Sequence, residues 1–274
     1  MSADTLTRAT IGTGHAHFGR LLLAEWTKLR TVRSTVWSFV VLIVAVIGFT
    51  SLFTALTVGQ WSTMQASDKA QIQLDPVPQI LGSGLFLGQL AVCVLGVLIA
   101  SSEYSTGMIR STLLASPHRL RMFAAKAIVF TIPVFVIGEA LSFASYEIGK
   151  AIFSGKVPTS LSDPHVTRAV IGSGLYLSVL GLFALAIGQI IRHTAGAITT
   201  VIALVLVLVP LAGLLPGNLG KHVSAYLPTN AGQQIIQIYP KNQILTAWQG
   251  FGVFAIWTAV LLAVAAFFLV ERDA

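Results

Sequence analysis

Long apolar runs alternate with short polar segments along most of the chain. Six of the runs hold about 18 to 23 mainly apolar residues, the length that a helix needs to cross the roughly 30 Å hydrocarbon core of a bilayer. The fourth and fifth runs are separated only by Arg192, His193 and Thr194, which predicts a tight helical hairpin. The predicted membrane spans are approximately 36–58, 80–101, 124–146, 169–191, 195–215 and 250–270.

The composition supports a lipid environment for these helices. Of the 274 residues 55% are hydrophobic and only 10% are charged, whereas soluble domains carry about 25% charged residues. We therefore expect an all-α integral membrane protein with six transmembrane helices. Its parts would be a cytoplasmic N-terminal segment, 1–35, and a single transmembrane domain, 36–274.

The distribution of positive charge predicts the orientation and argues against nucleic-acid binding. The net charge is +7, and its densest cluster, Arg20, Lys28, Arg30 and Arg33, directly precedes the first span. Cytoplasmic segments close to membrane helices are enriched in lysine and arginine. We expect a multi-pass protein of the plasma membrane with both termini in the cytoplasm, and no nucleic-acid partner.

Residues 18–34 have the pattern of an amphipathic helix that lies in the membrane interface. Its apolar face also carries Glu25, which a simple lipid anchor would not favour. Two interpretations stay open: Glu25 pairs with Lys28 or Arg33 on the same helix, or this face meets another protein. The apolar residues of the face are Phe18, Leu21, Leu22, Leu29 and Val32.

The polar stretch 102–117 between the second and third spans predicts a docking element. Ser105 or Thr106 is placed to cap a short helix that Pro117 would end. Such a helix, projecting from a bilayer with an apolar patch, is suited to contact a partner. The residues of the patch are Met108, Ile109, Thr112 and Leu113.

Three motifs in this order give the chain a resemblance to a known family. They are Glu25-Trp-Thr-Lys-Leu-Arg-Thr, Glu103-Tyr-Ser-Thr-Gly-Met-Ile-Arg110 and Tyr226-Leu-Pro-Thr-Asn-Ala-Gly-Gln233. The chain is similar over nearly its whole length to membrane (permease) subunits of ABC type-2 exporters, especially actinobacterial ones. The resemblance implies an interfacial connecting helix, a coupling helix between spans two and three, and an outer re-entrant helical hairpin before span six.

The family resemblance also implies partners and coupling residues. Two cytoplasmic ABC ATPase subunits would bind ATP and Mg, and a second copy of this chain or a related permease would complete the path. No catalytic residue and no cofactor is expected on this chain. The nearest match to a phosphate-binding loop, 149–156, does not fit, because Val157 follows it where Ser or Thr is needed. The implied ATPase-coupling residues are Glu25, Lys28, Arg30, Glu103, Tyr104, Thr106, Gly107, Met108, Ile109 and Arg110.

Residues 216–249 are too long for a tight turn and carry the motif of the re-entrant hairpin. Thr229 or Asn230 is expected to cap a short helix that ends at Pro240. Its apolar side would consist of Ile235, Ile236 and Tyr239. Because this helix is too short to cross the bilayer, we expect it to dip into the outer leaflet and to form the outer gate.

A carboxylate within the third span has two possible roles. Glu139 is costly to place in lipid, so it is either neutral or hydrogen-bonded to a neighbouring helix, or it lines the substrate path or outer gate. The candidate path or gate residues are Glu139, Asn230, Gln233, Ile236 and Tyr239. Gly84 and Gly88 form a GxxxG pair suited to helix packing, and the six scattered histidines predict no metal site.

The sequence favours an ATP-driven ABC exporter that moves a hydrophobic or amphipathic substrate out of the cytoplasm or the inner leaflet. A drug, a peptide and a lipid all fit. The alternative is a proton-coupled secondary transporter or a channel that uses Glu139. An intramembrane enzyme is disfavoured, because the spans contain no cluster of His, Asp or Glu at catalytic spacing.

Overall fold

A computed structural model describes residues 18–108, 118–239 and 244–271, and these residues form helices and connecting turns without any strand. Six helical runs are long and apolar enough to cross a membrane, in agreement with the predicted all-α, multi-pass architecture. They are α2 (Arg33–Gly59), α4 (Pro76–Ser105), α6 (Arg119–Phe153), α7 (Val166–Ile191), the run of α8 (Thr194–Ile202), η1 (Ala203–Val207) and α9 (Leu208–Gly213), and α12 (Ala247–Glu271).

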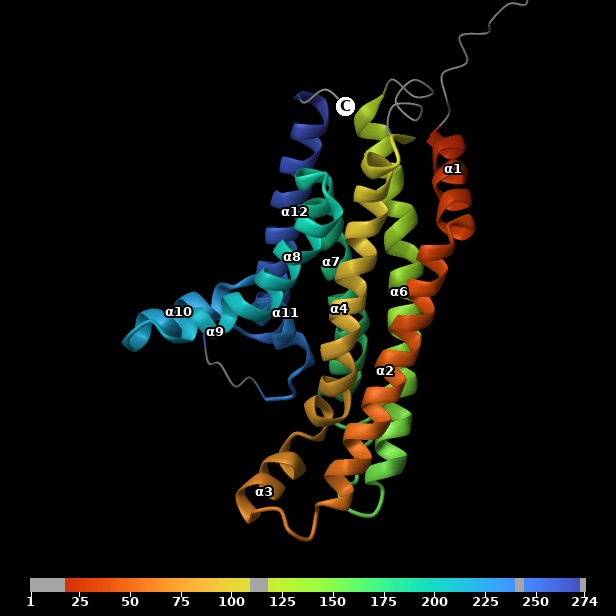
Figure 1. The fold of residues 1–274 in the computed structure, drawn as a ribbon. Coiled ribbons are helices and arrows are strands. Elements are labelled where there is room, and N and C mark those ends of the chain that lie inside the picture. Colours follow the sequence, from red (N-terminus) through yellow and green to blue (C-terminus); the bar gives the residue numbers. More distant parts are fainter. Residues whose placement is uncertain (1–17, 109–117, 240–243, 272–274) are drawn as a thin grey trace, which may run out of the picture.

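Shorter helices lie at both ends and on one side of the bundle (Figure 1). We call the two ends the α1 end, where α12 also finishes, and the α3 end. The helix α10 projects sideways from the bundle, and α11 leads back toward α7 (Figure 1). The shorter helices are α1 (Phe18–Thr31), α3 (Ala66–Leu74), α10 (Gly217–Tyr226), α11 (Pro228–Gln233) and the 3₁₀ turn η2 (Gln234–Ile236).

The helix α7 is the central element, and the other long helices gather around it. Of its most apolar 18-residue window 78% is buried inside the protein. Glycines allow the close approach: a Cβ atom added to Gly96 of α4 would lie 2.5 Å from the carbonyl oxygen of Gly181 of α7. Small residues at such crossings let helix backbones come into van der Waals contact, the main attraction between helices in lipid.

Gly84 and Gly88 lie at the crossing of α4 with α2. A Cβ atom on Gly84 would come within 2.1 Å of Oγ1 of Thr50, and one on Gly88 within 2.7 Å of Cγ2 of Val46. Both glycines therefore face α2 of the same chain.

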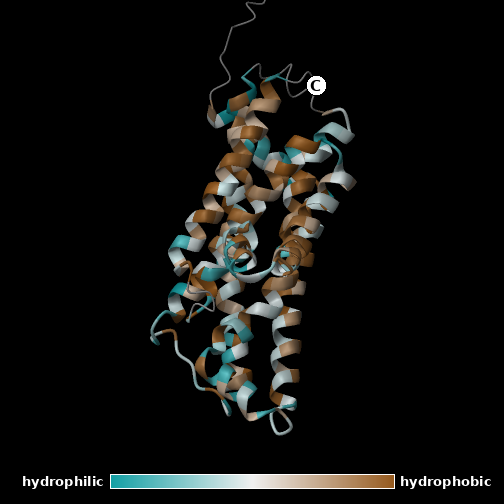
Figure 2. Ribbon diagram, turned by 90° about the vertical axis from the view of Figure 1, so that its left-hand side faces the viewer, coloured by the Kyte–Doolittle hydropathy of each residue, from teal (hydrophilic) through white to brown (hydrophobic). Residues whose placement is uncertain are grey.

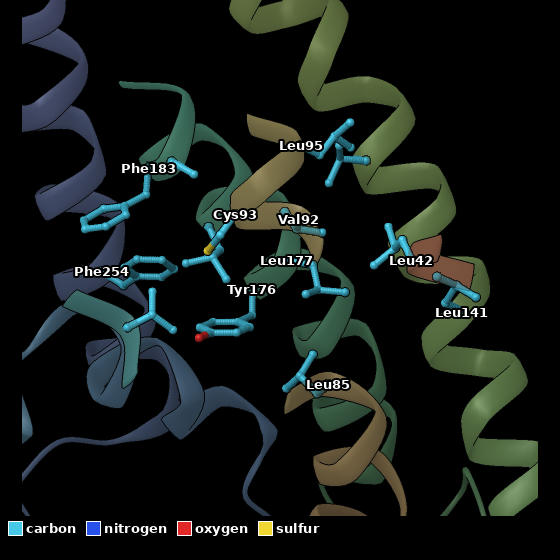
Figure 3. Close-up of a cluster of buried hydrophobic side chains, with 14 of the residues drawn as sticks. Leu42, Leu85, Val92, Cys93, Leu95, Leu141, Tyr176, Leu177, Phe183 and Phe254 are labelled. Carbon is cyan, nitrogen blue, oxygen red and sulfur yellow. The ribbon is translucent and has the colours of Figure 1, made fainter. Parts of the chain in front are cut away.

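Aromatic side chains fill the space between α7 and α12. The ring of Phe254 lies 5.5 Å from that of Tyr176 and 5.9 Å from that of Phe183, measured between centroids. Cys93 lies in the same apolar cluster and is 1% exposed (Figure 3). Apolar residues dominate the long helices along most of their length (Figure 2).

Two spans extend well beyond the ranges that hydropathy predicts. α6 continues to Phe153, because its last turns are packed: the hydroxyl groups of Tyr146 and Thr159 are 3.1 Å apart, and Phe153 meets the ring of Trp61 edge-on. α4 continues to Ser105, although Glu103 and its neighbours are polar. Apolar length alone misses such turns, because polar residues remain helical when tertiary partners satisfy them.

The fifth span is not a regular α-helix. Its middle, Ala203–Val207, is a π-helical turn. Pro210 lacks a backbone N–H and leaves the carbonyl of Leu206 without its usual donor, which accounts for a widened turn directly before it.

We expect Gly96→Leu to unfold the protein at a lower temperature. The side chain would push α4 away from the backbone of Gly181, and overpacking of this kind costs about 1–3 kcal/mol. Unfolding is measured by heating the detergent-solubilised protein with a thiol-reactive dye, which reaches Cys93 only when the core opens. Gly48→Leu is the matched control, because an added Cβ there meets nothing within 4 Å; equal melting of the two variants would contradict the close α4–α7 packing.

Candidate functional site

Four charged side chains from three helices form a cluster at the α1 end, which we call the ion cluster. Nζ of Lys28 lies 2.7 Å from Oε1 of Glu25 and 2.9 Å from Oε1 of Glu103. Nζ of Lys126 lies 2.5 Å from Oε2 of Glu103. The cluster thus joins α1, the last turn of α4 and the beginning of α6.

The charges of the ion cluster balance one another and are largely withdrawn from solvent. Glu25 is 7% exposed, Glu103 5% and Lys126 3%. Burial alone lowers the pKa of Lys28, but the hydrogen bonds and charges of Glu25 and Glu103 outweigh it and raise that pKa above its ordinary value. Lys28 therefore stays protonated at neutral pH, and each buried carboxylate keeps a cationic partner.

The residue next to Glu103 ties the same turn of α4 to the other side of the bundle. The hydroxyl oxygen of Tyr104 accepts a hydrogen bond from Nε2 of Gln189 on α7. The guanidinium of Arg192 lies 5.0 Å from the centroid of the Tyr104 ring, within the range of a cation–π interaction. Nη2 of Arg192 also donates to the carbonyl oxygen of Phe268 on α12, at 3.0 Å.

A second arginine binds the same end of α12. Nη1 of Arg119, the first residue of α6, donates to the carbonyl oxygens of Leu269 at 2.9 Å and Val270 at 3.2 Å. Cations at a helix C-terminus satisfy its last carbonyls and interact favourably with the helix dipole. The last turn of α4 is therefore linked to α1 and α6 through Glu103 and to α7 through Tyr104, and Arg192 extends the Tyr104 link to α12.

The chain leaves α4 by a turn that begins at Thr106. The hydroxyl of Thr106 donates to the carbonyl oxygen of Ser102 at 2.7 Å, and the hydroxyl of Ser105 donates to the same atom at 3.1 Å. Both hydroxyls thus help to close the end of α4. The predicted cap of the next helix stays a prediction, because residues 109–117 lie outside the described residues. Gly107 has φ +70°, a left-handed conformation that glycine adopts at helix ends.

The predicted coupling residues do not all lie in one place. Met108 follows the glycine turn and is 43% exposed. Arg30 is exposed and takes no part in the ion cluster. Ile109 and Arg110 lie outside the described residues, as do Thr112 and Leu113.

A cavity of about 240 Å³ opens beside the ion cluster, between α1, α2, α4 and α6. Glu25, Lys28 and Glu103 form its polar edge, and Ile99 and Phe130 are among its apolar walls. Glu25 therefore faces the interior of this chain. The predicted Glu25–Lys28 pair is present, while the partners Glu103 and Lys126 come from helices that the local sequence pattern of α1 does not reveal.

The hairpin before α12 differs in detail from the predicted helix. α11 begins at Pro228 with Leu227 in the capping position. Neither Thr229 nor Asn230 caps it; instead Nδ2 of Asn230 donates to the carbonyl oxygen of Ser224 at 2.8 Å, which ties α11 to α10. Proline fits the first turn of a helix, because its missing N–H would have no partner there.

The apolar side of the hairpin is also shorter than predicted. Ile235 and Ile236 are 0% and 4% exposed, but Tyr239 is 55% exposed. The helical turns end at Ile236, and Gln237 is extended with φ −79° and ψ 130°. Tyr239 therefore does not share the buried side, and its backbone N–H donates to Oδ2 of Asp75 at 3.4 Å.

Three polar side chains meet where this hairpin packs on the bundle, one each from α4, α7 and α11. We call them the glutamine triad. The hydroxyl of Tyr176 donates to Oε1 of Gln89 at 2.9 Å. Nε2 of Gln233 donates to the same oxygen at 3.2 Å and to the hydroxyl oxygen of Tyr176 at 3.3 Å. Gln233 is among the residues predicted from the sequence and Gln89 is not, although an amide inside an apolar run is itself a signal of a buried polar contact.

Glu139 lies at the crossing of α6 with α7 and makes no hydrogen bond with the glutamine triad. A Cβ atom on Gly174 would lie 2.5 Å from the carboxyl carbon of Glu139. Both carboxylate oxygens are buried, and neither has a hydrogen-bond partner among the described residues. Among all the described residues, no group of three or more His, Cys, Asp or Glu side chains is arranged to hold a metal ion.

Comparisons of the sequence with protein-family models and with curated proteins found no match.

We expect Glu103→Ala to destabilise the fold strongly. It would leave Lys126, which is 3% exposed, without a carboxylate, and breaking a buried ion pair in this way costs about 3–5 kcal/mol. The measurement is the temperature at which Cys93 becomes reactive in purified protein. Glu147→Ala is the control, because the Glu147–Lys150 pair is solvent-exposed with an N–O separation of 3.7 Å and should contribute little. Similar melting temperatures for both variants would show that the ion cluster does not stabilise the α1 end.

Proposed function

We propose that the chain is the permease subunit of an ATP-driven ABC exporter, with the α1 end in the cytoplasm. The observation that carries the proposal is the anchoring of the last turn of α4. Glu103 and Tyr104 connect that turn to α1, α6, α7 and α12. The family resemblance of the motif 103–110 supplies the partner, a cytoplasmic ATPase that binds ATP and Mg.

The geometry is suited to the transmission of force. Since Gly107 follows α4 by only two residues, a push on the turn at 106–108 acts directly on the helix end. The ion cluster passes this push to α1 and α6, and the Tyr104 contacts pass it to α7 and α12. Packed helices respond by rigid-body shifts, because their close contacts resist continuous deformation.

The cargo path needs a second permease, either another copy of this chain or a relative. Each subunit would line the path with apolar helix surfaces, which suit a hydrophobic or amphipathic substrate leaving the cytoplasm or the inner leaflet. The hairpin of α10, α11 and η2 then closes the path on the outer side. Its buried isoleucines, Ile235 and Ile236, and the ties of Asn230 and Gln233 hold it against the bundle.

The test places a photo-crosslinking amino acid at Met108 in the full-length protein, in membranes of the cells that naturally make it. We expect one main crosslinked partner, identified by mass spectrometry as an ATPase with a GxxxxGK[ST] phosphate-binding loop. The control position is Leu74 at the far end of the bundle, which is 64% exposed and should not crosslink to that partner. No ATPase at position 108, or the same ATPase at both positions, would overturn the proposal.

A second candidate function rests on Glu139, whose two carboxylate oxygens are buried without a hydrogen-bond partner in the described part of the chain. Such a group suits a proton relay in a secondary transporter or channel. Under the exporter proposal, liposomes containing only this chain should admit no more protons than empty liposomes after a pH jump. The readout is a pH-sensitive dye trapped inside. Proton entry that Glu139→Gln abolishes would favour the proton-coupled transporter instead.

A further inference from the structure

A small cavity of about 150 Å³ lies between α4 and the last part of the hairpin, formed by α11 and η2. Leu85 and Phe86 of α4 and Ile236 of η2 give it apolar walls. Three glutamines, Gln89, Gln233 and Gln237, also line it. The cavity therefore joins an apolar surface to hydrogen-bonding groups at the place where the hairpin meets the bundle.

The hydrogen bonds of the glutamine triad leave two polar atoms available to this cavity. Oε1 of Gln89 already accepts from Tyr176 and from Nε2 of Gln233. Among the described residues, Nε2 of Gln89 and Oε1 of Gln233 make no hydrogen bond. Neither atom is fully buried, and both residues line the cavity. The amide NH2 group of Gln89 and the amide oxygen of Gln233 thus remain open, and an occupant that satisfies both is favoured.

The chemistry of the lining excludes a charged occupant. None of the described residues that line the cavity is ionisable. An ion there would lose water without gaining a counter-charge, which is costly in an apolar environment. An uncharged group with a hydrogen-bond acceptor and a donor close together meets both requirements.

We propose that this cavity binds an amide group, a carboxamide or a lactam, of the exported compound. Export of the compound rests on the proposed function, whereas binding of the amide does not. A volume of about 150 Å³ is well below the roughly 300–1,000 Å³ of a site for a drug-sized ligand. The cavity therefore holds one polar group of the cargo, and the remaining apolar part lies along α4 outside it.

The experiment uses two photoreactive probes with the same ten-carbon diazirine-bearing chain. One probe ends in a carboxamide and the other in a carboxylate. Each is irradiated with the full-length protein in lipid nanodiscs at neutral pH, without any ATPase, and labelled peptides are mapped by mass spectrometry. We expect the amide probe to label the stretches around residues 82–89 and 233–237, excess unlabelled decanamide to prevent it, and the carboxylate probe to label them at least about tenfold less.

Two variants test the cavity without relying on one another. Gly82→Leu fills it, because Gly82 lines the cavity and an added Cβ meets nothing within 4 Å, and it leaves the glutamine triad intact. Gln89→Leu removes the open donor. Both should reduce amide labelling about tenfold or more, whereas Gly48→Leu, a matched glycine on α2 with open space around it, should not.

The outcomes separate this inference from the proposed function. Equal labelling by the amide and carboxylate probes, or labelling that survives Gly82→Leu, would overturn the amide site. The result does not depend on the ATPase crosslink at Met108. If that crosslink fails while amide labelling behaves as expected, the binding site stands and the exporter proposal falls.

Discussion

The α1 end depends on the burial of one carboxylate. Glu103 lies at the end of a membrane helix, 5% exposed, where an unpaired charge would be expensive. Lys28 and Lys126 satisfy its two oxygens from different helices. This requirement holds α1 against α6 and extends α4 past its apolar part. The turn that leaves the bundle at Gly107 thereby gains a rigid base.

Within the bundle the organising constraint is different, because lipid supplies little hydrophobic drive for helices to associate. Contact between backbones takes its place, at Gly96 with Gly181 and at Gly84 with Thr50. These crossings fix α4 between α2 and α7. The polar groups of Glu103, Tyr104 and Gln89 then lie on a helix whose position is already determined by packing. Because packing fixes the position of α4, each of these groups meets a defined hydrogen-bond partner.

The sequence predicts the six long helices well, because length and apolar composition are local properties. It also predicts the Glu25–Lys28 pair, which needs only helical spacing. The remaining partners could not be predicted, since Glu103, Lys126 and Gln89 meet their neighbours only in the folded bundle. Tyr239 was misplaced for a related reason: the chain becomes extended at Gln237, and a helical pattern does not apply beyond that point.

The helix α4 connects the two sites that carry our proposals. Residues 89 and 103 belong to one unbroken helix and lie about 21 Å apart at 1.5 Å per residue. The fifth span, by contrast, is interrupted by a π-helical turn before Pro210, so it is less suited to pass a displacement along its axis. A displacement of the last turn of α4 would therefore be transmitted along the helix to Gln89 with little reduction in size. Gln233 of the hairpin takes part in the same hydrogen bonds, so that displacement would change the packing of α4 against the hairpin. The affinity of the proposed site between them for an amide would then change as well.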